Sequence, residues 1–205
     1  MRKLGRLIAA FVVSFGVGLF LPDMGTAGTS AYLVGKKPIR QPTGAAEMCT
    51  RYAWACASDR TMADFDDAQL RLARRVNLNV NRQTPQIADR KQYASAEMWA
   101  LPTRRGGDCE DFALLKKLQL MRAGIPGGRL LIATVLDRNR KGHAVLVVRT
   151  HRGDLVLDNL TNRVLRWDKT GYTFLKMQNP RDPGRWDAIL EGGILTTTAS
   201  IPAGS

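Results

Sequence analysis

Four short apolar segments lie close together in the second half of the chain, and the links between them are very short. The segments are residues 129–136, 142–150, 154–160 and 163–167. Here the hydrophobic pattern follows a period of two, which is typical of β-strands. Parallel strands need a crossover of a dozen or more residues, whereas links such as HRG and TN fit only antiparallel neighbours. The sequence therefore predicts an antiparallel meander.

A helical pattern comes directly before these strands, over residues 108–123. Its large apolar residues fall on one face: Leu114, Leu115, Leu118 and Met121. Asp108 is a good N-cap, and Asp111 has the spacing of a capping box, so both carboxylates are expected to bond the free N–H groups of the first turn. Gly124 then ends the helix.

Two further helices are predicted upstream, over residues 61–80 and 86–100. Thr61 and Asp64 have the spacing of a capping box for the first of them, and residues 77–85 are expected to be its frayed exit. Helices followed by an antiparallel sheet indicate the α+β class, with the helix at 108–123 packed on the sheet.

The N-terminus has the pattern of a secretory signal peptide, residues 1–27. A positively charged start precedes an apolar run that is short for a membrane span, and small residues then offer a cleavage site near Ala27. We therefore expect the chain to divide into this peptide, a flexible leader at 28–45, one domain at 46–192 and a loose tail at 193–205. The mature protein would be periplasmic or secreted.

The net charge of +13 raises the question of a nucleic-acid partner. No dense stripe of Lys and Arg with interleaved aromatic residues is present, and an exported protein rarely meets nucleic acid, so we predict no such partner. A basic surface is equally suited to attracting an acidic polymer or protein, or simply to solubility.

Export changes the interpretation of the three cysteines, Cys49, Cys56 and Cys109. In an oxidising compartment a pair tends to form a disulfide and one is left over. Cys49 and Cys56 are seven residues apart and can close a small loop, so they are the predicted pair. Cys109 is then the free thiol, at the start of the helix at 108–123.

Two polar residues interrupt the apolar strands, His143 and Asp158. If His151 and Arg152 form a two-residue turn, the hairpin register makes His143 and Asp158 diagonal neighbours on one face. Their backbones would lie roughly 7–8 Å apart, within reach of an imidazole and a carboxylate. Asp158 would fix the tautomer of His143, and the other ring nitrogen would face the helix that carries Cys109.

Together these three residues form a candidate Cys–His–Asp site for acyl transfer. The helix N-terminus and a nearby imidazolium would both lower the pKa of the Cys109 thiol. The plainer alternative is a packed cysteine and a histidine whose hydrogen bonds are satisfied locally.

The segments GDCEDFALLKKLQLMRAGIP, GHAVLVV and LVLDNL resemble the bacterial transglutaminase-like cysteine proteinases. This group includes the LapG-type periplasmic proteases that release surface adhesins, and the resemblance covers about residues 45–190. It implies Cys109 as nucleophile, His143 as general base and Asp158 as the carboxylate that orients it. It also implies a papain-like, transglutaminase-type core, so the domain at 46–192 is expected to be transglutaminase-like.

The carboxylates beside Cys109 would raise the pKa of its thiol if nothing offset them. Capping by Asp108 and Asp111 is one explanation. The other is a calcium ion, because carboxylate oxygens in a glycine-rich turn suit Ca²⁺ and the resemblance implies calcium at Asp108 and Glu110. Both explanations remain open at this stage, and no organic cofactor is expected.

The function predicted from these features is that of an exported cysteine endopeptidase. The resemblance implies a large surface protein or adhesin as substrate, and an inner-membrane receptor as a possible regulator. One alternative is an amidase or transglutaminase that passes the acyl group to an amine. Another is a non-catalytic, calcium-dependent periplasmic binding module with a vestigial triad.

Overall fold

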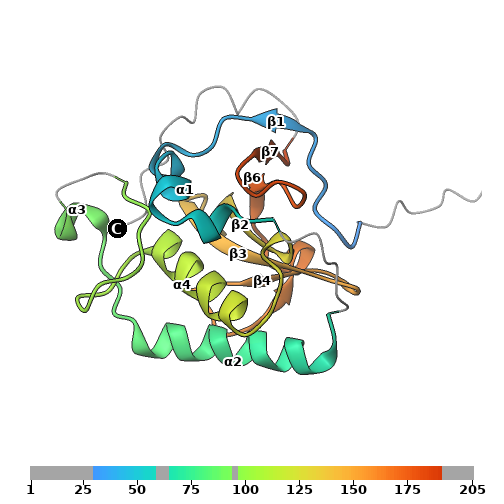
Figure 1. Ribbon diagram of the computed structural model, residues 1–205, viewed down its shortest axis with the longest axis horizontal. Coiled ribbons are helices and arrows are strands. Elements are labelled where there is room, and N and C mark those ends of the chain that lie inside the picture. The colour runs from blue at the N-terminus through green and yellow to red at the C-terminus, as the bar shows by residue number, and fades with distance from the viewer. Residues whose placement is uncertain (1–29, 59–64, 94–96, 191–205) are drawn as a thin grey trace, which may run out of the picture.

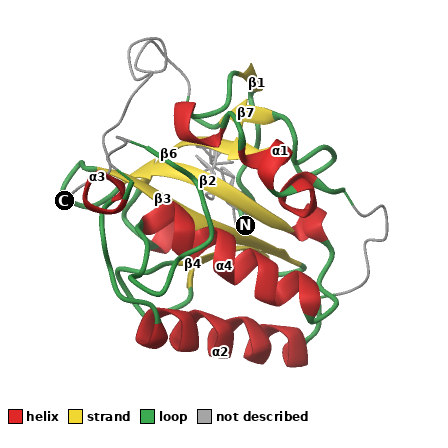
Figure 2. Cartoon of the chain, turned by 60° about the vertical axis from the view of Figure 1, so that its left-hand side comes forward, coloured by secondary structure: helices red, strands yellow, loops and turns green. Residues whose placement is uncertain are grey.

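The computed structural model describes residues 30–58, 65–93 and 97–190. Within them, one antiparallel sheet has the strand order β1-β7-β6-β2-β3-β4-β5 (Figure 1). Its strands are β1 Lys37–Ile39, β2 Leu130–Leu136, β3 Gly142–Thr150, β4 Gly153–Leu157, β5 Leu165–Arg166, β6 Thr173–Gln178 and β7 Trp186–Ala188. Helices cover one face of this sheet (Figure 2), which confirms the α+β class.

The predicted meander is confirmed, because β2, β3, β4 and β5 are neighbours in chain order. The predicted hairpin register is confirmed as well, since Thr150 pairs with Gly153 and leaves His151 and Arg152 as the turn. β4 is shorter than expected and ends at Leu157. Asp158 therefore lies one residue beyond the strand, where the chain leaves the sheet.

Three strands were not indicated by the sequence pattern: β1, β6 and β7. β6 extends the sheet on the other side of β2, β7 follows it, and β1 forms the edge by pairing with β7. β1 belongs to the segment expected to be a leader, and nearby Leu33 is buried. A strand of three residues carries too little periodicity to be recognised, and its partner lies far along the chain.

Helix α4, Cys109–Arg122, packs on β3 and β2, and α2, Asp67–Gln83, lies alongside α4 (Figure 2). The main hydrophobic core fills the space between these helices and the sheet. It includes Val76, Val80, Phe112, Leu114, Leu120, Leu130, Ile132, Leu146, Val148 and Leu157. The opposite face of the sheet has a second, smaller core that includes Val135, Val145, Val147 and Val156.

The predicted boundaries of the upstream helices are partly wrong. α2 is capped by Asp66, whose carboxylate accepts from the backbone N–H of Gln69 in a complete capping box, while Thr61 and Asp64 lie outside the described residues. The expected frayed exit at 77–85 is helical as far as Gln83, because Asn77 and Val80 are buried against the rest of the domain.

The helix predicted at 86–100 is also wrong in extent. Of that segment only the single turn α3, Asp89–Gln92, is helical among the described residues. Asp89 is buried, and its backbone N–H donates to the carboxylate of Asp108. The segment is therefore held by hydrogen bonding at Asp89 rather than by an amphipathic face.

The predicted disulfide between Cys49 and Cys56 is confirmed. It joins α1, Met48–Arg51, to the short 3₁₀ helix Ala53–Cys56. The carbonyl of Ala55 in this loop accepts a hydrogen bond of 2.7 Å from the buried ammonium of Lys117, on α4. The disulfide loop is thereby attached to the helix that begins with Cys109.

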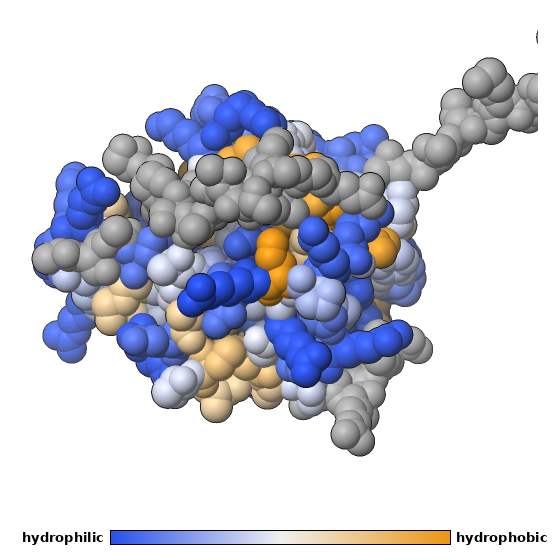
Figure 3. Space-filling view, turned by 90° about the horizontal axis from the view of Figure 1, so that it is seen from above, coloured by the Kyte–Doolittle hydropathy of each residue, from blue (hydrophilic) through white to orange (hydrophobic). Residues whose placement is uncertain are grey.

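The predicted signal peptide at 1–27 and the predicted tail at 193–205 lie outside the described residues. Within the described ranges, no helix is both long and apolar enough to cross a bilayer. Hydrophilic side chains cover much of the described surface seen from above (Figure 3), in keeping with a chain of net charge +13.

Candidate active site

His143 and Asp158 are brought together as the hairpin register predicts. Nε2 of His143 lies 2.8 Å from Oδ1 of Asp158, and both side chains are buried. His143 is at the start of β3 and Asp158 directly follows β4, so the antiparallel pairing of the two strands sets their separation. With Asp158 bonded to Nε2, the ring nitrogen Nδ1 remains for another partner.

Asp158 is held by two donors besides His143. The backbone N–H of Leu160 donates to Oδ1 at 3.0 Å, and the hydroxyl of Tyr172 donates to Oδ2 at 2.5 Å. Burial by itself raises the pKa of Asp158, but the hydrogen bond and charge of His143, with the hydroxyl of Tyr172, outweigh it. The pKa of Asp158 is therefore lowered, and the carboxylate stays ionised at neutral pH.

Tyr172 is a residue of the site that the sequence did not reveal. Besides its hydrogen bond to Asp158, its ring meets the ring of His143 edge-on, with centroids 5.9 Å apart. Burial, and then the hydrogen bond to Asp158, raise the pKa of its phenol, which therefore remains a donor. Tyr172 lies just before the unpredicted strand β6, so nothing in the sequence pattern connected it to the site.

The loop that carries Asp158 is fastened to α2 by two asparagines. Nδ2 of Asn81 donates to the backbone carbonyl of Asp158 at 2.8 Å, and Nδ2 of Asn77 donates to the carbonyl of Thr161 at 3.3 Å. Asn77 and Asn81 are four residues apart, so they share one face of α2. The run NLNVN was the available signal, since asparagines are unfavourable inside a helix without such a role.

Cys109 is the first residue of α4, as predicted. Its Sγ lies 3.0 Å from Oε2 of Glu110, and the backbone N–H of Ala144, directly after His143, is within hydrogen-bonding reach of the sulfur. The structure thus brings the thiol to the strand that carries His143.

The expected lowering of the thiol pKa is not what the protein chain alone produces. Burial raises the pKa of Cys109 well above its usual value, the negative charges of Glu110 and Asp108 raise it further, and only the N–H of Ala144 opposes them. The carboxylates beside Cys109 therefore have the effect expected of them when nothing offsets their charge.

Three carboxylates converge at the start of α4, and we call Asp89, Asp108 and Asp111 the acidic cluster. One carboxylate oxygen from each lies within 4.8 Å of the others. Each also has a buried oxygen without a hydrogen-bond partner among the described residues. Burial and the neighbouring charge of Asp108 raise the pKa of Asp89 to about 6.

Burial raises the pKa of Asp111 to about 8, against a hydrogen bond from the backbone N–H of Ala100, and also raises that of Asp108. Such a set of hard oxygen donors fits a divalent cation.

The predicted capping by Asp108 is wrong. Asp108 occupies the N-cap position with extended backbone angles, but its side chain makes no capping hydrogen bond to the described helix. Its Oδ2 instead accepts from the backbone N–H of Asp89 at 3.3 Å, because the carboxylate turns toward the acidic cluster. Glu110 lies outside this trio and contacts both Asp108 and Cys109.

The chain has relatives of known family and structure. The family model described as bacterial transglutaminase-like cysteine proteinase matches residues 36–193. A solved structure of Legionella pneumophila LapG is 27% identical, with a TM-score of 0.50, and the match covers 58% of this chain and 69% of that one. EGTA-treated LapG from the same organism is 26% identical, with a TM-score of 0.50, over 64% of this chain and 75% of that one.

A calcium-bound LapG structure from this organism is 26% identical, with a TM-score of 0.49, over 63% of this chain and 74% of that one. No match is found among curated proteins.

Proposed function

We infer the chemistry of the site from the premise that the chain belongs to the bacterial transglutaminase-like cysteine proteinases and is a cysteine peptidase of that type. We propose that Cys109 is the nucleophile, His143 the general base and Asp158 the carboxylate that orients it. The observation that supports these roles is the 2.8 Å hydrogen bond between His143 and Asp158, beside the backbone N–H that reaches the thiol.

In this mechanism Asp158 accepts a hydrogen bond from the Nε2–H of His143, which leaves Nδ1 unprotonated as the base. Nδ1 takes the proton of the Cys109 thiol as the sulfur attacks the carbonyl carbon of a peptide bond. The imidazolium then protonates the leaving amine, and a thioester remains. Water hydrolyses the thioester with His143 again acting as base, which restores the thiol.

Two features of the chain assist these steps. The low pKa of Asp158 keeps its charge in place to stabilise the imidazolium that forms on His143. Cys109 is the first residue of α4, and the first N–H groups of a helix have no acceptor within the helix, so they are suited to stabilise the oxyanion of the tetrahedral intermediate.

We also propose that the acidic cluster binds calcium. Asp89, Asp108 and Asp111 would hold the ion, with backbone carbonyls or waters completing its coordination, because carboxylate oxygens without partners are the ligands that Ca²⁺ prefers. When bound, calcium supplies positive charge next to the carboxylates that raise the pKa of Cys109. This assignment keeps Asp108 from the sequence prediction and replaces Glu110 by two other aspartates.

The proposed roles can be tested with the free thiol. Iodoacetamide should alkylate Cys109 of the calcium-treated protein at neutral pH, and at least tenfold more slowly in a His143→Ala variant, because the base that removes the proton is gone. Mass spectrometry of the tryptic peptide containing Cys109 measures both rates. Equal rates in the two proteins would contradict the role of His143.

For the substrate, we propose a large extended protein at the cell surface, such as an adhesin, as the resemblance implies. Comparing surface proteins from cells with wild-type protein and with Cys109→Ser should reveal new chain ends only in the wild type. Each new end that carries one water, without an isopeptide crosslink, indicates hydrolysis rather than acyl transfer to an amine. Crosslinked products would favour the transglutaminase alternative.

Export to the periplasm or beyond, after cleavage near Ala27, completes the proposal. The disulfide between Cys49 and Cys56 supports it, because disulfides persist in oxidising compartments. N-terminal sequencing of the mature protein tests the cleavage site. An inner-membrane receptor that sequesters the protease is proposed on the resemblance alone, and co-purification of Cys109→Ser with membrane proteins tests it.

A further inference from the structure

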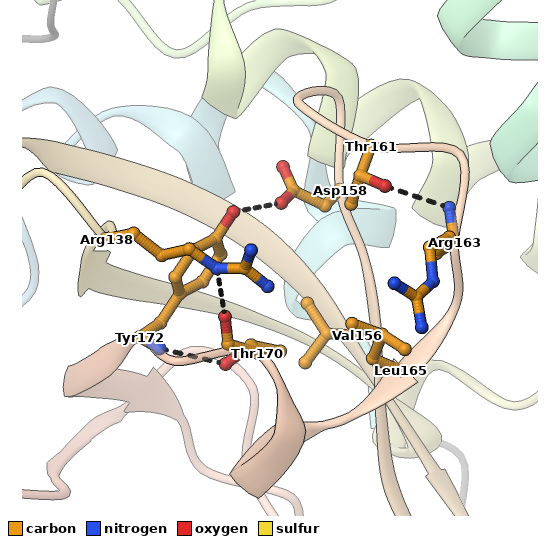
Figure 4. A pocket seen from close by; sticks show the side chains of 8 residues that line it. All are labelled: Arg138, Val156, Asp158, Thr161, Arg163, Leu165, Thr170 and Tyr172. Carbon is orange, nitrogen blue, oxygen red and sulfur yellow. Dashed lines mark hydrogen bonds between the residues drawn. The ribbon is translucent and has the colours of Figure 1, made fainter.

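A small, shallow hollow that opens to solvent adjoins Asp158 (Figure 4). It is lined by residues of β4 and β5, the loop between them, the turn after β2 and the segment before β6. These residues are Arg138, Val156, Asp158, Thr161, Arg163, Leu165, Thr170 and Tyr172. The proposed function makes no use of this hollow.

Two guanidinium groups line it without an acidic partner. Arg138 and Arg163 are exposed, and neither forms an ion pair with a carboxylate of the described residues. Nε of Arg138 donates to the carbonyl of Thr170 at 2.8 Å, which fixes the direction of that side chain. In the view of Figure 4 the two guanidinium groups lie on either side of Val156, and both keep N–H groups without a partner among the described residues.

Asp158 makes no ion pair with these arginines, although it is the one acidic residue among the described residues of the lining. Its two oxygens accept hydrogen bonds from His143, Leu160 and Tyr172. Figure 4 shows its carboxylate directed to the hydroxyl of Tyr172 rather than to either guanidinium. Two guanidinium groups against one ionised carboxylate leave the hollow a net positive charge beside the candidate triad.

Two aliphatic side chains, Val156 and Leu165, also line the hollow. Aliphatic side chains together with two guanidinium groups match a glutamate or aspartate side chain, whose methylene groups pack on aliphatic side chains while its carboxylate accepts paired N–H bonds. Arginine binds carboxylates in this paired manner, with hydrogen bonds about twice as strong as neutral ones.

We propose that this hollow is a subsite that takes an acidic side chain of the polypeptide substrate. The inference rests on the proposed function, since it places the scissile bond at Cys109 and His143. Asp158 separates His143 from the hollow, and an extended peptide advances roughly 3.3 Å per residue, so an acidic residue a few positions from the cleaved bond reaches it. The net charge of +13 favours the approach of an acidic segment.

The test uses the wild-type protein with calcium and a library of decapeptides randomised at every position, with cleavage products identified by mass spectrometry. Wild type should enrich Glu or Asp at one position near the cleaved bond. For a peptide pair that differs only by Glu or Gln there, kcat/KM should favour Glu by about tenfold, the value of a charge-assisted hydrogen bond.

The Arg163→Gln variant should weaken this preference, and the double variant Arg138→Gln/Arg163→Gln should lose it, so that the Glu and Gln peptides are cleaved with similar kcat/KM. Arg163 is the safer single variant, because its guanidinium makes no hydrogen bond to the described residues. Arg74→Gln, an exposed position on α2, makes the same change in charge elsewhere and should keep the preference.

Absence of an acidic preference in the wild type, or its persistence in the double variant, would overturn the subsite and leave the proposed function standing. Failure of the wild type to cleave any library peptide would overturn the proposed function, and this inference with it.

Discussion

Asp158 is buried, as are Asp89 and Asp111 of the acidic cluster, with Asp108 partly buried, but the protein treats these carboxylates in opposite ways. Asp158 receives three hydrogen bonds from the protein, and its pKa is lowered. Asp89, Asp108 and Asp111 face one another with unpartnered oxygens, and burial raises the pKa of each, to about 6 for Asp89 and about 8 for Asp111.

The difference shows what stabilises a buried charge. Burial disfavours the ionised form in both regions, so the outcome depends on what the carboxylate oxygens meet. N–H and O–H donors of the chain are sufficient at Asp158, whereas the carboxylates of the acidic cluster keep oxygens without a partner among the described residues. The first region is complete in the polypeptide, and the second is the one at which we propose that calcium binds.

The largest expected effect on activity comes from removing the negative charge of Asp158. Asp158→Asn should lower kcat/KM for a cleaved peptide by about 10³- to 10⁴-fold, because an amide favours the wrong tautomer of His143. Asp182→Asn, on an exposed turn, is the control and should retain activity. A loss of less than tenfold in Asp158→Asn would show that the carboxylate does not orient the base.

Stabilisation by calcium should depend on the acidic cluster and not on Asp158. At a concentration 100 times its Kd it contributes about 2.7 kcal/mol to the free energy of unfolding, which raises Tm by roughly 5–10 °C for a domain of this size. Differential scanning fluorimetry in calcium and in EGTA measures this shift. Asp111→Asn should abolish it, whereas Asp158→Asn should keep it, and equal shifts in both variants would contradict the assignment.

Removing one of the groups that donate a hydrogen bond to Asp158 should have a smaller effect on activity. Tyr172→Phe deletes the hydroxyl that donates to Oδ2 and should lower kcat/KM by roughly tenfold or more, in line with about 1.5–3 kcal/mol for a hydrogen bond to a charged group.

The pH dependence of activity in Tyr172→Phe gives the direction in which the pKa of Asp158 moves. Because the hydroxyl lowers the pKa of Asp158, its loss raises that pKa, and the acid limb of the activity profile should move to higher pH. Tyr32→Phe is a matched control, since it removes a hydroxyl that bonds the carbonyl of His151 outside the site. An unmoved acid limb in Tyr172→Phe would mean that this residue only packs.

The smallest expected effect concerns the backbone of Asp158. Asn81→Ala removes the hydrogen bond to the carbonyl of Asp158 and should cost about 1 kcal/mol, or roughly fivefold in kcat/KM. Asn79→Ala, on the exposed face of the same helix, should leave kcat/KM unchanged. Identical kinetics of the two variants would show that α2 does not position the loop.

The sequence was sufficient for the features that local pattern encodes. Short links required antiparallel neighbours, and a two-residue turn at His151 and Arg152 fixed the register that brings His143 to Asp158. Helical spacing and a glycine stop located the helix that begins at Cys109. These inferences depend on residues close together in the chain, where geometry leaves few alternatives.

Contacts between distant segments were decided only by the tertiary structure. Asp89 joins Asp108 from 19 residues away, and Tyr172 reaches Asp158 from 14 residues away, just before a strand with no recognisable pattern. Whether a carboxylate caps a helix, binds a cation or orients a base depends on which groups packing brings to its oxygens. The chain thus determined which residues have the chemistry, and the fold determined which of their oxygens are satisfied.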